Sequence, residues 1–200
     1  MARERQRGEA NTASRILDIA ERLVQSRGFN GFSYADIAAE LNVTKASLHY
    51  HFPGKAELGE ALIVRYAARF ADALEQIDEQ GGDARARLDA YAGIYGDVLR
   101  DQRMCLCGML AADYETLPEP MQAAVIRYID DNETWLVGVL ERGIEEGSLQ
   151  LAGSPRDAAQ TIVSGLEGAM LVARPYGDVH RFEAAAAGLL SVLAATAPGR

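Results

Sequence analysis

The sequence predicts an all-α fold in which a small N-terminal domain is followed by a larger helical domain. Alanine is abundant among the 200 residues and runs of β-branched residues are short, and both features favour helices over strands. Apolar residues recur at helical spacing, as in Ile16, Ala20, Leu23 and Val24, which is the pattern of one buried helix face. Glycine and proline separate the periodic segments from one another.

Three helices are expected in the N-terminal part. The polar residues 1–11 are expected to form a mobile arm, and the first helix then runs to Arg27-Gly28, where the glycine is a natural C-cap. Ser33 and Thr44 are good N-caps for two short helices, the second of which covers residues 45–51.

Longer helices are expected in the C-terminal part, after the break at Phe52-Pro53-Gly54. They cover residues 55–80, 84–100, 105–115, 119–146, 155–174 and 178–196. Residues 197–200 are expected to fray. We therefore place the domain boundary after residue 55, which gives domains 1–55 and 56–200.

The composition excludes several classes of protein. It is 48% hydrophobic and 24% charged, as in a globular protein that buries a core. No apolar run approaches the length of a membrane span, and the charged start of the chain lacks the apolar region of a secretory signal. Because there are only two cysteines and no export signal, we expect a cytoplasmic protein with no disulfide framework. Because no apolar run is long enough to span a bilayer, no membrane partner is expected.

The formal net charge of −9 argues against nucleic-acid binding when it is taken over the whole chain. The charge is unevenly distributed, however. Residues 1–55 hold eight Lys and Arg against six Asp and Glu, and the remaining residues hold twelve against twenty-three. Phosphate contacts depend on local charge, so the N-terminal part can still hold DNA while the acidic body repels it.

Residues 34–52 have the pattern of a helix-turn-helix, a pair of short helices that exposes its second helix to the major groove. The apolar residues that would fix the crossing of the pair are Ile37, Ala38, Leu41, Val43 and Leu48. The residues that we predict to bind DNA are Ser33, Tyr34, Thr44, Lys45, Ser47, His49, Tyr50, His51 and Lys55. No acidic residue interrupts the second helix, and Lys55 opens the next helix, whose N-terminal N–H groups also favour a phosphate. The alternative is a three-helix packing unit without DNA.

Residues 16–58 resemble the DNA-binding domain of the TetR/AcrR family of repressors. The similarity lies in ILDIA (16–20), RGF (27–29), DIA (36–38), VTKASL (43–48) and YHFPGK (50–55). Residues 163–174 resemble, more weakly, the penultimate helix of that family. The resemblance implies a homodimer of about nine helices with a C-terminal domain for ligand binding and dimerisation. It further implies that Tyr50, His51 and Lys55 hold phosphates and that the groove is faced by Thr44, Lys45, Ser47, His49 and Tyr50. Family members often carry Tyr where His49 stands, which leaves open the base pairs that are read.

A homodimer on a palindromic operator would supply two half-sites about one helical turn apart. Two stripes of small residues could let helices of two subunits approach closely. The predicted interface residues are Gly165, Gly168, Ala169, Ala184, Ala187 and Gly188. Packing within one subunit is the alternative explanation of these stripes.

A small-molecule effector is implied for the C-terminal domain by the same resemblance. Aromatic and methionine side chains line apolar ligand sites, although they also fill cores. The candidate ligand-binding residues are Tyr66, Phe70, Tyr91, Tyr95, Met104, Cys105, Cys107, Met109, Trp135 and Met170, and Tyr114 and Tyr128 share their character.

Cys105 and Cys107 leave two interpretations open. Both could be small buried residues, or one could be a reactive thiol that electrophiles or oxidants modify, with Arg103 favouring the thiolate. Two cysteines two residues apart on a helix point to nearly opposite faces, so a disulfide between them would be strained. A metal site is not expected, because the chain has only three histidines.

Two other classes of function are a helical enzyme and an adaptor that does not bind DNA. A helical enzyme would need a nucleophile–base set or a phosphate-cradling loop, and none is present in the sequence. An adaptor without DNA binding would not need the unbroken set of polar side chains on one short helix. We therefore predict a non-enzymatic repressor that needs no cofactor and is released from DNA by a ligand, with a thiol sensor as the alternative. Sequence patterns do not distinguish a repressor from an activator.

Overall fold

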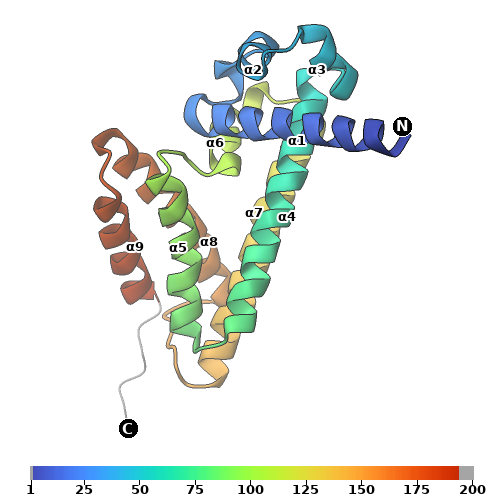
Figure 1. The fold of residues 1–200 in the computed structure, drawn as a ribbon. Coiled ribbons are helices and arrows are strands. Elements are labelled where there is room, and N and C mark those ends of the chain that lie inside the picture. Colours follow the sequence, from blue (N-terminus) through green and yellow to red (C-terminus); the bar gives the residue numbers. More distant parts are fainter. Residues whose placement is uncertain (1, 194–200) are drawn as a thin grey trace. The chain divides into compact units, whose positions relative to one another are not determined.

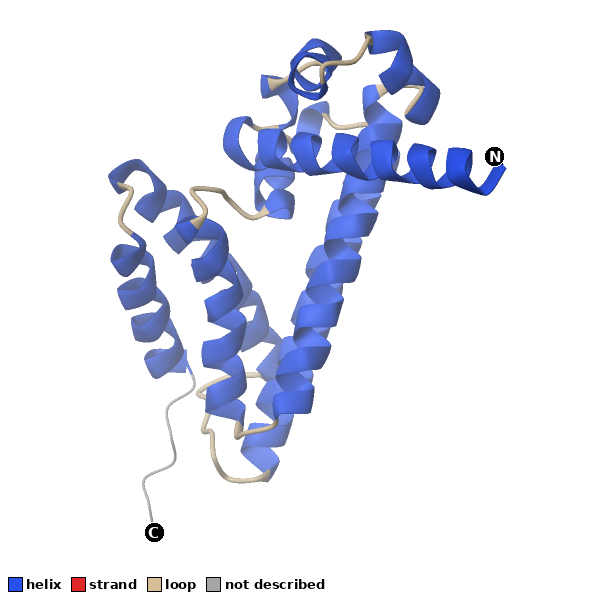
Figure 2. Cartoon of the chain, viewed as in Figure 1, coloured by secondary structure: helices blue, strands red, loops and turns tan. Residues whose placement is uncertain are grey.

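The structure, a computed structural model, describes residues 2–193. Figure 2 shows that the described part consists of helices joined by loops, with no strand. The nine α-helices among these residues are α1 (Ala2–Arg27), α2 (Tyr34–Leu41), α3 (Lys45–His51), α4 (Lys55–Gln80), α5 (Ala84–Arg100), α6 (Leu106–Ala112), α7 (Glu119–Glu145), α8 (Pro155–Ala173) and α9 (Val179–Leu193). Short 3-10 turns follow α1, α6 and α8: η1 (Phe29–Gly31), η2 (Tyr114–Thr116) and η3 (Arg174–Tyr176). The predicted all-α fold of about nine helices is confirmed.

Three local predictions need correction or fall outside the structure. The mobile arm is wrong, because α1 begins at Ala2; residues 2–11 are mostly good helix formers, and no proline occurs before Pro53. The helix expected over residues 105–115 is shorter and ends in η2. The expected end of the last helix, residues 194–196, and the expected frayed end at 197–200 lie outside the described residues.

The chain forms two compact units. Unit 1 comprises the described residues up to Ala67 together with Leu106–Val125, and unit 2 comprises Ala68–Cys105 together with the described residues from Ile126 onward. The sequence placed a boundary after residue 55. The units divide differently because α4 runs without a break from Lys55 to Gln80, and because α6 packs against α1.

In unit 1, α1 packs against α2, η1 and α6, and α2 packs against α3 (Figure 1). Its core contains Ile16, Ile37, Leu48 and Leu58, each at most 1% exposed. On the surface of this core, Arg65 of α4 pairs with Asp18 at 2.7 Å and with Glu21 at 2.8 Å, both on α1. The apolar faces and these ion pairs together fix the start of α4 against α1.

In unit 2, α8 packs against α9, and α5 packs against both (Figure 1). The close approach of α8 and α9 depends on Gly165, because a Cβ added there would lie 2.5 Å from Leu189 Cδ2. Phe182 of α9 is 2% exposed and Leu166 of α8 is fully buried. None of the described helices is long and apolar enough to cross a membrane.

Candidate DNA-binding face and sensor interior

The turn between α2 and α3 has a fixed backbone geometry. Asn42 adopts the left-handed conformation with φ 55°, and the Val43 N–H donates to the Ala38 carbonyl at 3.0 Å. Thr44 then caps α3, since its side-chain oxygen accepts a hydrogen bond from the Ser47 N–H at 3.3 Å. Leu48, fully buried, packs α3 into unit 1. The two helices are therefore held at a defined angle, as a helix-turn-helix requires.

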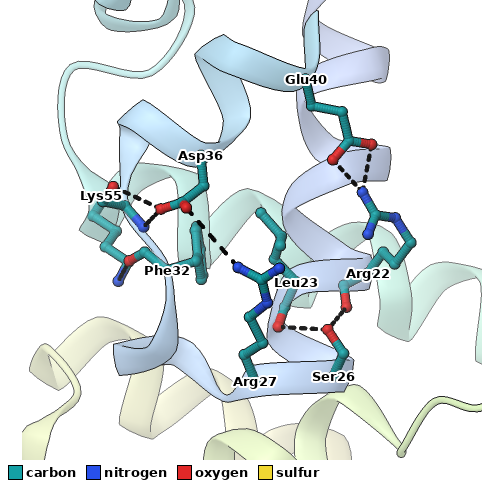
Figure 3. Close-up of polar contacts among 9 residues, drawn as sticks. Arg22, Leu23, Ser26, Arg27, Phe32, Asp36, Glu40 and Lys55 are labelled. Carbon is teal, nitrogen blue, oxygen red and sulfur yellow. Dashed lines mark hydrogen bonds and ion pairs between the residues drawn. The ribbon is translucent and has the colours of Figure 1, made fainter.

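The start of α2 is fixed by a capping box. The Asp36 carboxylate accepts hydrogen bonds from the Ser33 N–H at 2.8 Å and from the Ser33 hydroxyl at 2.7 Å. These hydrogen bonds from Ser33, aided by Arg27 at 3.9 Å, lower the pKa of Asp36. Figure 3 shows the Arg27 contact and, nearby, the ion pair between Arg22 of α1 and Glu40 of α2. The charged form of Asp36 thus stabilises the start of α2.

Tyr34 and His49 fix the loop that follows α3. The Tyr34 hydroxyl lies 2.6 Å from the Gly54 carbonyl oxygen and 3.0 Å from that of Phe52. Burial, with a smaller contribution from Glu57, raises the pKa of Tyr34 to about 12, so its hydroxyl stays a donor. The His49 ring lies 4.8 Å from the Tyr34 ring, and its Nδ1 is 2.9 Å from the Pro53 carbonyl oxygen. Because a carbonyl only accepts, Nδ1 carries the hydrogen.

Lys55 points into unit 1. Its ammonium donates to the Phe29 carbonyl. It also donates, at 2.6 Å, to the carbonyl of Phe32, which lies beside Lys55 in Figure 3. It also lies 4.6 Å from the centre of the Phe29 ring and 4.2 Å from that of Phe32, a cation–π geometry. Burial lowers the pKa of Lys55, while Asp113 and Asp36 act in the opposite direction. The ammonium therefore fixes the segment between α1 and α2.

The residues predicted to bind DNA thus fall into two groups. Ser33, Tyr34 and Lys55 use their polar atoms within unit 1, as described above. Lys45, His49 and Tyr50 are exposed on α3, and Tyr50 is 70% exposed despite its large ring. Thr44 is exposed at the helix N-cap, and Ser47 and His51 are half-buried on the same helix. The structure brings this second group together on one short helix.

Asp113 belongs to the same unit but was not predicted. It follows α6, and its carboxylate accepts hydrogen bonds from the N–H groups of Phe29 at 2.7 Å and Asn30 at 3.4 Å. Asn30 in turn donates to the Thr116 hydroxyl at 2.7 Å. The sequence offered no signal for this contact, because the partners are 84 residues apart and an isolated Asp resembles any surface carboxylate.

Phe70 and three tyrosines are buried in unit 2, and the half-buried Trp135 stacks on one of the tyrosines. The Phe70 ring meets those of Tyr91, Tyr95 and Tyr128 edge-on at 6.0, 6.1 and 5.4 Å, and Trp135 stacks on Tyr91 at 5.6 Å. The Tyr91 hydroxyl lies 3.1 Å from that of Tyr95 and donates to Asn132 at 3.3 Å. Asn132, which is 3% exposed, was not predicted. These rings combine an apolar surface with buried hydrogen-bonding groups.

The other predicted ligand residues divide between the units. Met104 and Met170 are buried in unit 2. Tyr66 and Cys107, both buried, and the half-buried Met109 belong to unit 1. Met109 lies close to Gly28 there, since its Cε would be 3.8 Å from a Cβ added to that glycine. The structure therefore brings only part of the predicted set together.

Cys105 and Cys107 are buried, and neither is in a disulfide. They stand on opposite sides of a boundary between units, which falls between Cys105 and Leu106. The Cys105 Sγ is 3.9 Å from the Tyr128 hydroxyl oxygen. Burial raises the pKa of Glu167, and the Cys105 thiol acts in the opposite direction. Among the described residues, no group of three or more His, Cys, Asp or Glu is arranged to hold a metal ion.

The predicted interface residues lie on α8 and α9. Gly168, Ala184, Ala187 and Gly188 are exposed, and Ala169 is half-buried. Gly165 instead packs against Leu189 of its own chain, as the alternative of packing within one subunit predicted. Large apolar side chains are exposed on the same two helices: Leu171 at 62%, Val172 at 59% and Val192 at 80%.

Comparison with known proteins identifies the family. Residues 16–62 match the family of bacterial regulatory proteins called tetR, and residues 84–189 match the family of tetracyclin repressor-like C-terminal domains. The chain is 28% identical over 196 residues to the HTH-type transcriptional repressor NemR of Escherichia coli K12, covering 94% of this chain and 97% of NemR. It is 29% identical over 152 residues to the transcriptional regulator AcuR of Cereibacter sphaeroides, covering 74% and 69% of the two chains.

Solved structures agree with this assignment. A TetR-family regulator from Agrobacterium tumefaciens is 33% identical, with a TM-score of 0.90 and coverage of 94% of this chain and all of the other. A structure described as the reduced form of E. coli NemR is 29% identical, with a TM-score of 0.79 and coverage of 92% and 98%. The predicted resemblance is confirmed. The chain belongs to the TetR family, and it is a DNA-binding transcriptional regulator rather than an enzyme.

Proposed function

We propose that the protein is a cytoplasmic, homodimeric repressor that places α3 in the major groove of a palindromic operator and leaves the DNA when a small molecule binds. The observation that carries this proposal is the exposed face of α3, where Lys45, His49 and Tyr50 project from a helix that its N-cap and its buried inner face hold in unit 1. In an HTH protein the second helix reads bases, and flanking donors hold phosphates.

Each exposed residue of α3 has a proposed role. Lys45 and Tyr50 contact phosphates, because an ammonium and a phenol are both donors to phosphate oxygens. At the edge of the same face, hydrogen-bond donors on shorter side chains are added by Thr44, Ser47 and His51. Ser33, Tyr34 and the Lys55 side chain act indirectly in this proposal, by fixing α2 and the loop before α4.

His49 is proposed to read a base edge. Its Nδ1 hydrogen is directed to the Pro53 carbonyl at 2.9 Å, so Nε2 of the neutral ring is an acceptor. In the major groove, the amino groups of adenine and cytosine are donors, whereas phosphate oxygens only accept. The neutral ring therefore suits one of these two bases better than a phosphate.

The homodimer is proposed to form through α8 and α9. The exposed small residues Gly168, Ala184 and Gly188 would let helices of two subunits approach closely, and the exposed Leu171 and Val192 would then become buried. Two copies related by a two-fold axis supply the two half-sites of a palindrome.

The aromatic interior of unit 2 is the proposed effector site. Phe70, Tyr91, Tyr95 and Trp135 offer ring faces and edges, while Asn132 and the tyrosine hydroxyls offer hydrogen bonds. The dimer is proposed to have two arrangements, one of which fits the operator. A ligand that binds the other arrangement more tightly shifts the dimer toward it and so lowers the affinity for DNA.

A thiol sensor is the second candidate. The observation that favours it is the burial of the Cys105 thiol, whose Sγ lies 3.9 Å from the Tyr128 hydroxyl oxygen. The similarity to NemR, whose solved structure is described as a reduced form, supports it further. Modification of Cys105 would act at the point where the chain leaves unit 2 for α6 of unit 1.

Fluorescence anisotropy on DNA from the upstream region of the protein's own gene tests the proposal. We expect tight binding that weakens as the salt concentration rises. Tyr50→Ala should lower the DNA affinity. Lys45→Ala should also lower it, and should reduce the slope of log affinity against log salt concentration by about 1. Tyr176→Ala, which removes an equally exposed tyrosine from unit 2, should have no effect. If Lys45→Ala and Tyr50→Ala both bind as the unchanged protein does, α3 is not the DNA-reading helix.

Adding an electrophile to the same assay separates the two candidates. If the electrophile abolishes DNA binding, and if the double variant Cys105→Ser with Cys107→Ser keeps DNA binding in its presence, the thiol sensor is supported. Binding that the electrophile leaves unchanged supports a reversible ligand in the interior of unit 2.

A further inference from the structure

Unit 2 contains a hollow that is separate from its aromatic interior. The hollow lies where α5 ends beside the connection between α8 and α9 (Figure 1), and it is lined by residues of 99–103 and 173–180. Its volume is about 560 Å³, which is in the range of pockets that take small organic ligands. The aromatic residues of the proposed effector site do not belong to this lining, so the hollow is a second candidate site.

The lining of the hollow is basic, although this part of the chain is acidic. Residues 56–200 hold twelve Lys and Arg against twenty-three Asp and Glu. The charged and titratable groups among the described lining residues are instead Arg100, Arg103, Arg174 and His180 against one carboxylate, that of Asp178. Asp178 already serves the start of α9, because its Oδ1 accepts a hydrogen bond from the His180 N–H at 3.0 Å. An anion in the hollow therefore meets mainly positive charge.

The turn after α5 brings a second arginine and an amide to the hollow. The Gln102 N–H donates to the Leu99 carbonyl at 2.8 Å, and the Arg103 N–H donates to the Val98 carbonyl at 3.0 Å, which is the pattern of a Schellman motif. Gln102 has the left-handed conformation of this motif, with φ 57°, where glycine is the usual residue. A glutamine at this position adds a side-chain amide, which can donate to an anion, to the lining.

The carboxylates that pair with two of these arginines do not line the hollow. Arg103 pairs with Asp101, and Arg100 pairs with Asp97 and, at 2.7 Å, with Glu183. The side chains of Asp97 and Asp101 are 78% and 62% exposed, and ion pairs of such exposed groups contribute little free energy. Because a guanidinium has five N–H donors, both arginines keep the capacity to bind an anion in the hollow.

We propose that the hollow binds a small organic carboxylate, which Arg100 and Arg103 hold at its charged end. A guanidinium can donate two parallel hydrogen bonds to a carboxylate. The carbon chain of the ligand lies against Leu99, Ala173 and Val179, of which Ala173 is 1% exposed and the other two are half-buried. Inorganic phosphate has no apolar part to bury against these side chains, so the hollow suits an organic acid better.

Glu183 of α9 is the carboxylate with which such a ligand competes. Its carboxylate oxygens lie 2.7 Å from the Arg100 guanidinium and 2.9 Å from Nδ1 of His180. Hydrogen bonds from Arg100 and, to a smaller extent, from His180 lower the pKa of Glu183, so it is charged at neutral pH. Loss of this charge frees Arg100 for a ligand. The inference therefore predicts opposite effects of removing an arginine and of removing Glu183.

Isothermal titration calorimetry with hexanoate at pH 7 tests the inference. We expect hexanoate to bind, and we expect Arg100→Gln and Arg103→Gln each to weaken its binding on the order of 10-fold. Glu183→Gln should strengthen binding by roughly 2- to 5-fold. Arg85→Gln removes another arginine of α5, which pairs with the exposed Asp89, and should have no effect. Circular dichroism checks that each variant is folded, and Arg103→Gln with Glu183→Gln keeps the test valid if Arg100→Gln does not fold.

Proton NMR then locates the bound ligand. The chain has three histidines, so the ring signals of His180 are assigned by their loss in His180→Gln. Hexanoate should shift these signals, because His180 lines the hollow. The inference is overturned if hexanoate does not bind, if it leaves the His180 signals in place, or if inorganic phosphate binds more tightly than hexanoate. It is also overturned if Arg103→Gln and Glu183→Gln both bind hexanoate as the unchanged protein does.

Discussion

The Asp113 carboxylate lies 2.7 Å from the backbone N–H of Phe29 and fixes the turn that leads from α1 into the helix-turn-helix. The same turn is held from its carbonyl side by the Lys55 ammonium, at Phe29 and Phe32. The negative charge of Asp113 thus binds backbone N–H donors of the segment between α1 and α2, and the positive charge of Lys55 binds its carbonyl acceptors. Because Asp113 directly follows α6, a shift of α6 would alter the start of the DNA-binding helices.

Asp113→Asn tests this contact. The amide keeps the shape of the side chain but loses the charge that strengthens the hydrogen bond to Phe29, so we expect a loss of about 1–3 kcal/mol in the free energy of unfolding. DNA affinity should fall as well. Urea denaturation and anisotropy measure the two effects. Asp131→Asn, at an exposed position on α7, should change neither, and equal behaviour of the two variants would contradict the role of Asp113.

The two lysines should react very differently with an amine reagent. Lys45 is exposed, whereas the Lys55 ammonium is half-buried and donates to two carbonyls. N-hydroxysuccinimide acetate followed by peptide mass spectrometry should label Lys45 first, and bound operator should protect it. Lys55→Met should lower the free energy of unfolding by about 1–3 kcal/mol without changing the salt slope of DNA binding. Rapid labelling of Lys55, or a salt slope lowered by about 1 in this variant, would instead indicate a phosphate contact.

Acid should weaken the start of α2. Because the folded-state pKa of Asp36 is lowered, its charged form contributes stability that is present above the unfolded value of about 3.9 and is lost as the pH falls through the folded pKa. Asp36→Asn removes this contribution at every pH and should flatten the acid limb of the stability curve. Thermal unfolding followed by circular dichroism from pH 6 to pH 2 measures it; an unchanged acid limb would exclude the capping box as its source.

Gly59→Ala should overpack unit 1. A Cβ at Gly59 would lie 2.4 Å from the Sδ and Cε atoms of the fully buried Met121, so we expect a loss of about 1–3 kcal/mol. Met121→Ala in the same chain should recover part of it, which a double-mutant cycle measures. Gly93→Ala on α5 has open space around its Cβ and should instead stabilise the helix. Equal effects at the two glycines would show that α4 and α7 are less closely packed than described.

Leu171→Glu should disrupt the proposed dimer. The change places a charge on an exposed apolar position of α8, where dimerisation would bury it at a cost of several kcal/mol. Light scattering should then report a monomer, and operator affinity should fall. Val64→Glu, at a similarly exposed position on α4, should leave a dimer. A dimeric Leu171→Glu protein would place the interface elsewhere.

The sequence predicted the helices well because their boundaries are local. Thr44 caps α3 from its own side chain, and Gly28, with φ 80°, ends α1 in a conformation that glycine readily adopts. The face of α3 was predictable for the same reason, since helical spacing alone determines which of its residues share a side. The prediction of a mobile arm is wrong for residues 2–11, because a polar segment without an apolar stripe can still be helical when most of its residues have high helix propensity.

The contacts that depend on tertiary structure were not predictable. Lys55 was assigned to phosphates because of its place at the start of a helix, but the carbonyls of Phe29 and Phe32 reach its ammonium only in the folded unit. Asp113 looked like an ordinary surface carboxylate in an acidic chain. Its partners are backbone N–H groups of a distant segment, so neither periodicity nor a motif indicates it.

The division of unit 1 between two stretches of the chain affects how its DNA specificity could be exchanged for that of another regulator. A fragment ending at Ala67 would carry α3 but would lack Asp113 and Met121, which come from the second stretch. Transferring unit 1 to another regulator therefore requires both of its stretches, the one up to Ala67 and Leu106–Val125, or redesign of the contacts between them. For the same reason, substitutions near residue 113 could alter operator binding in a genetic screen although they lie far from α3 in the sequence.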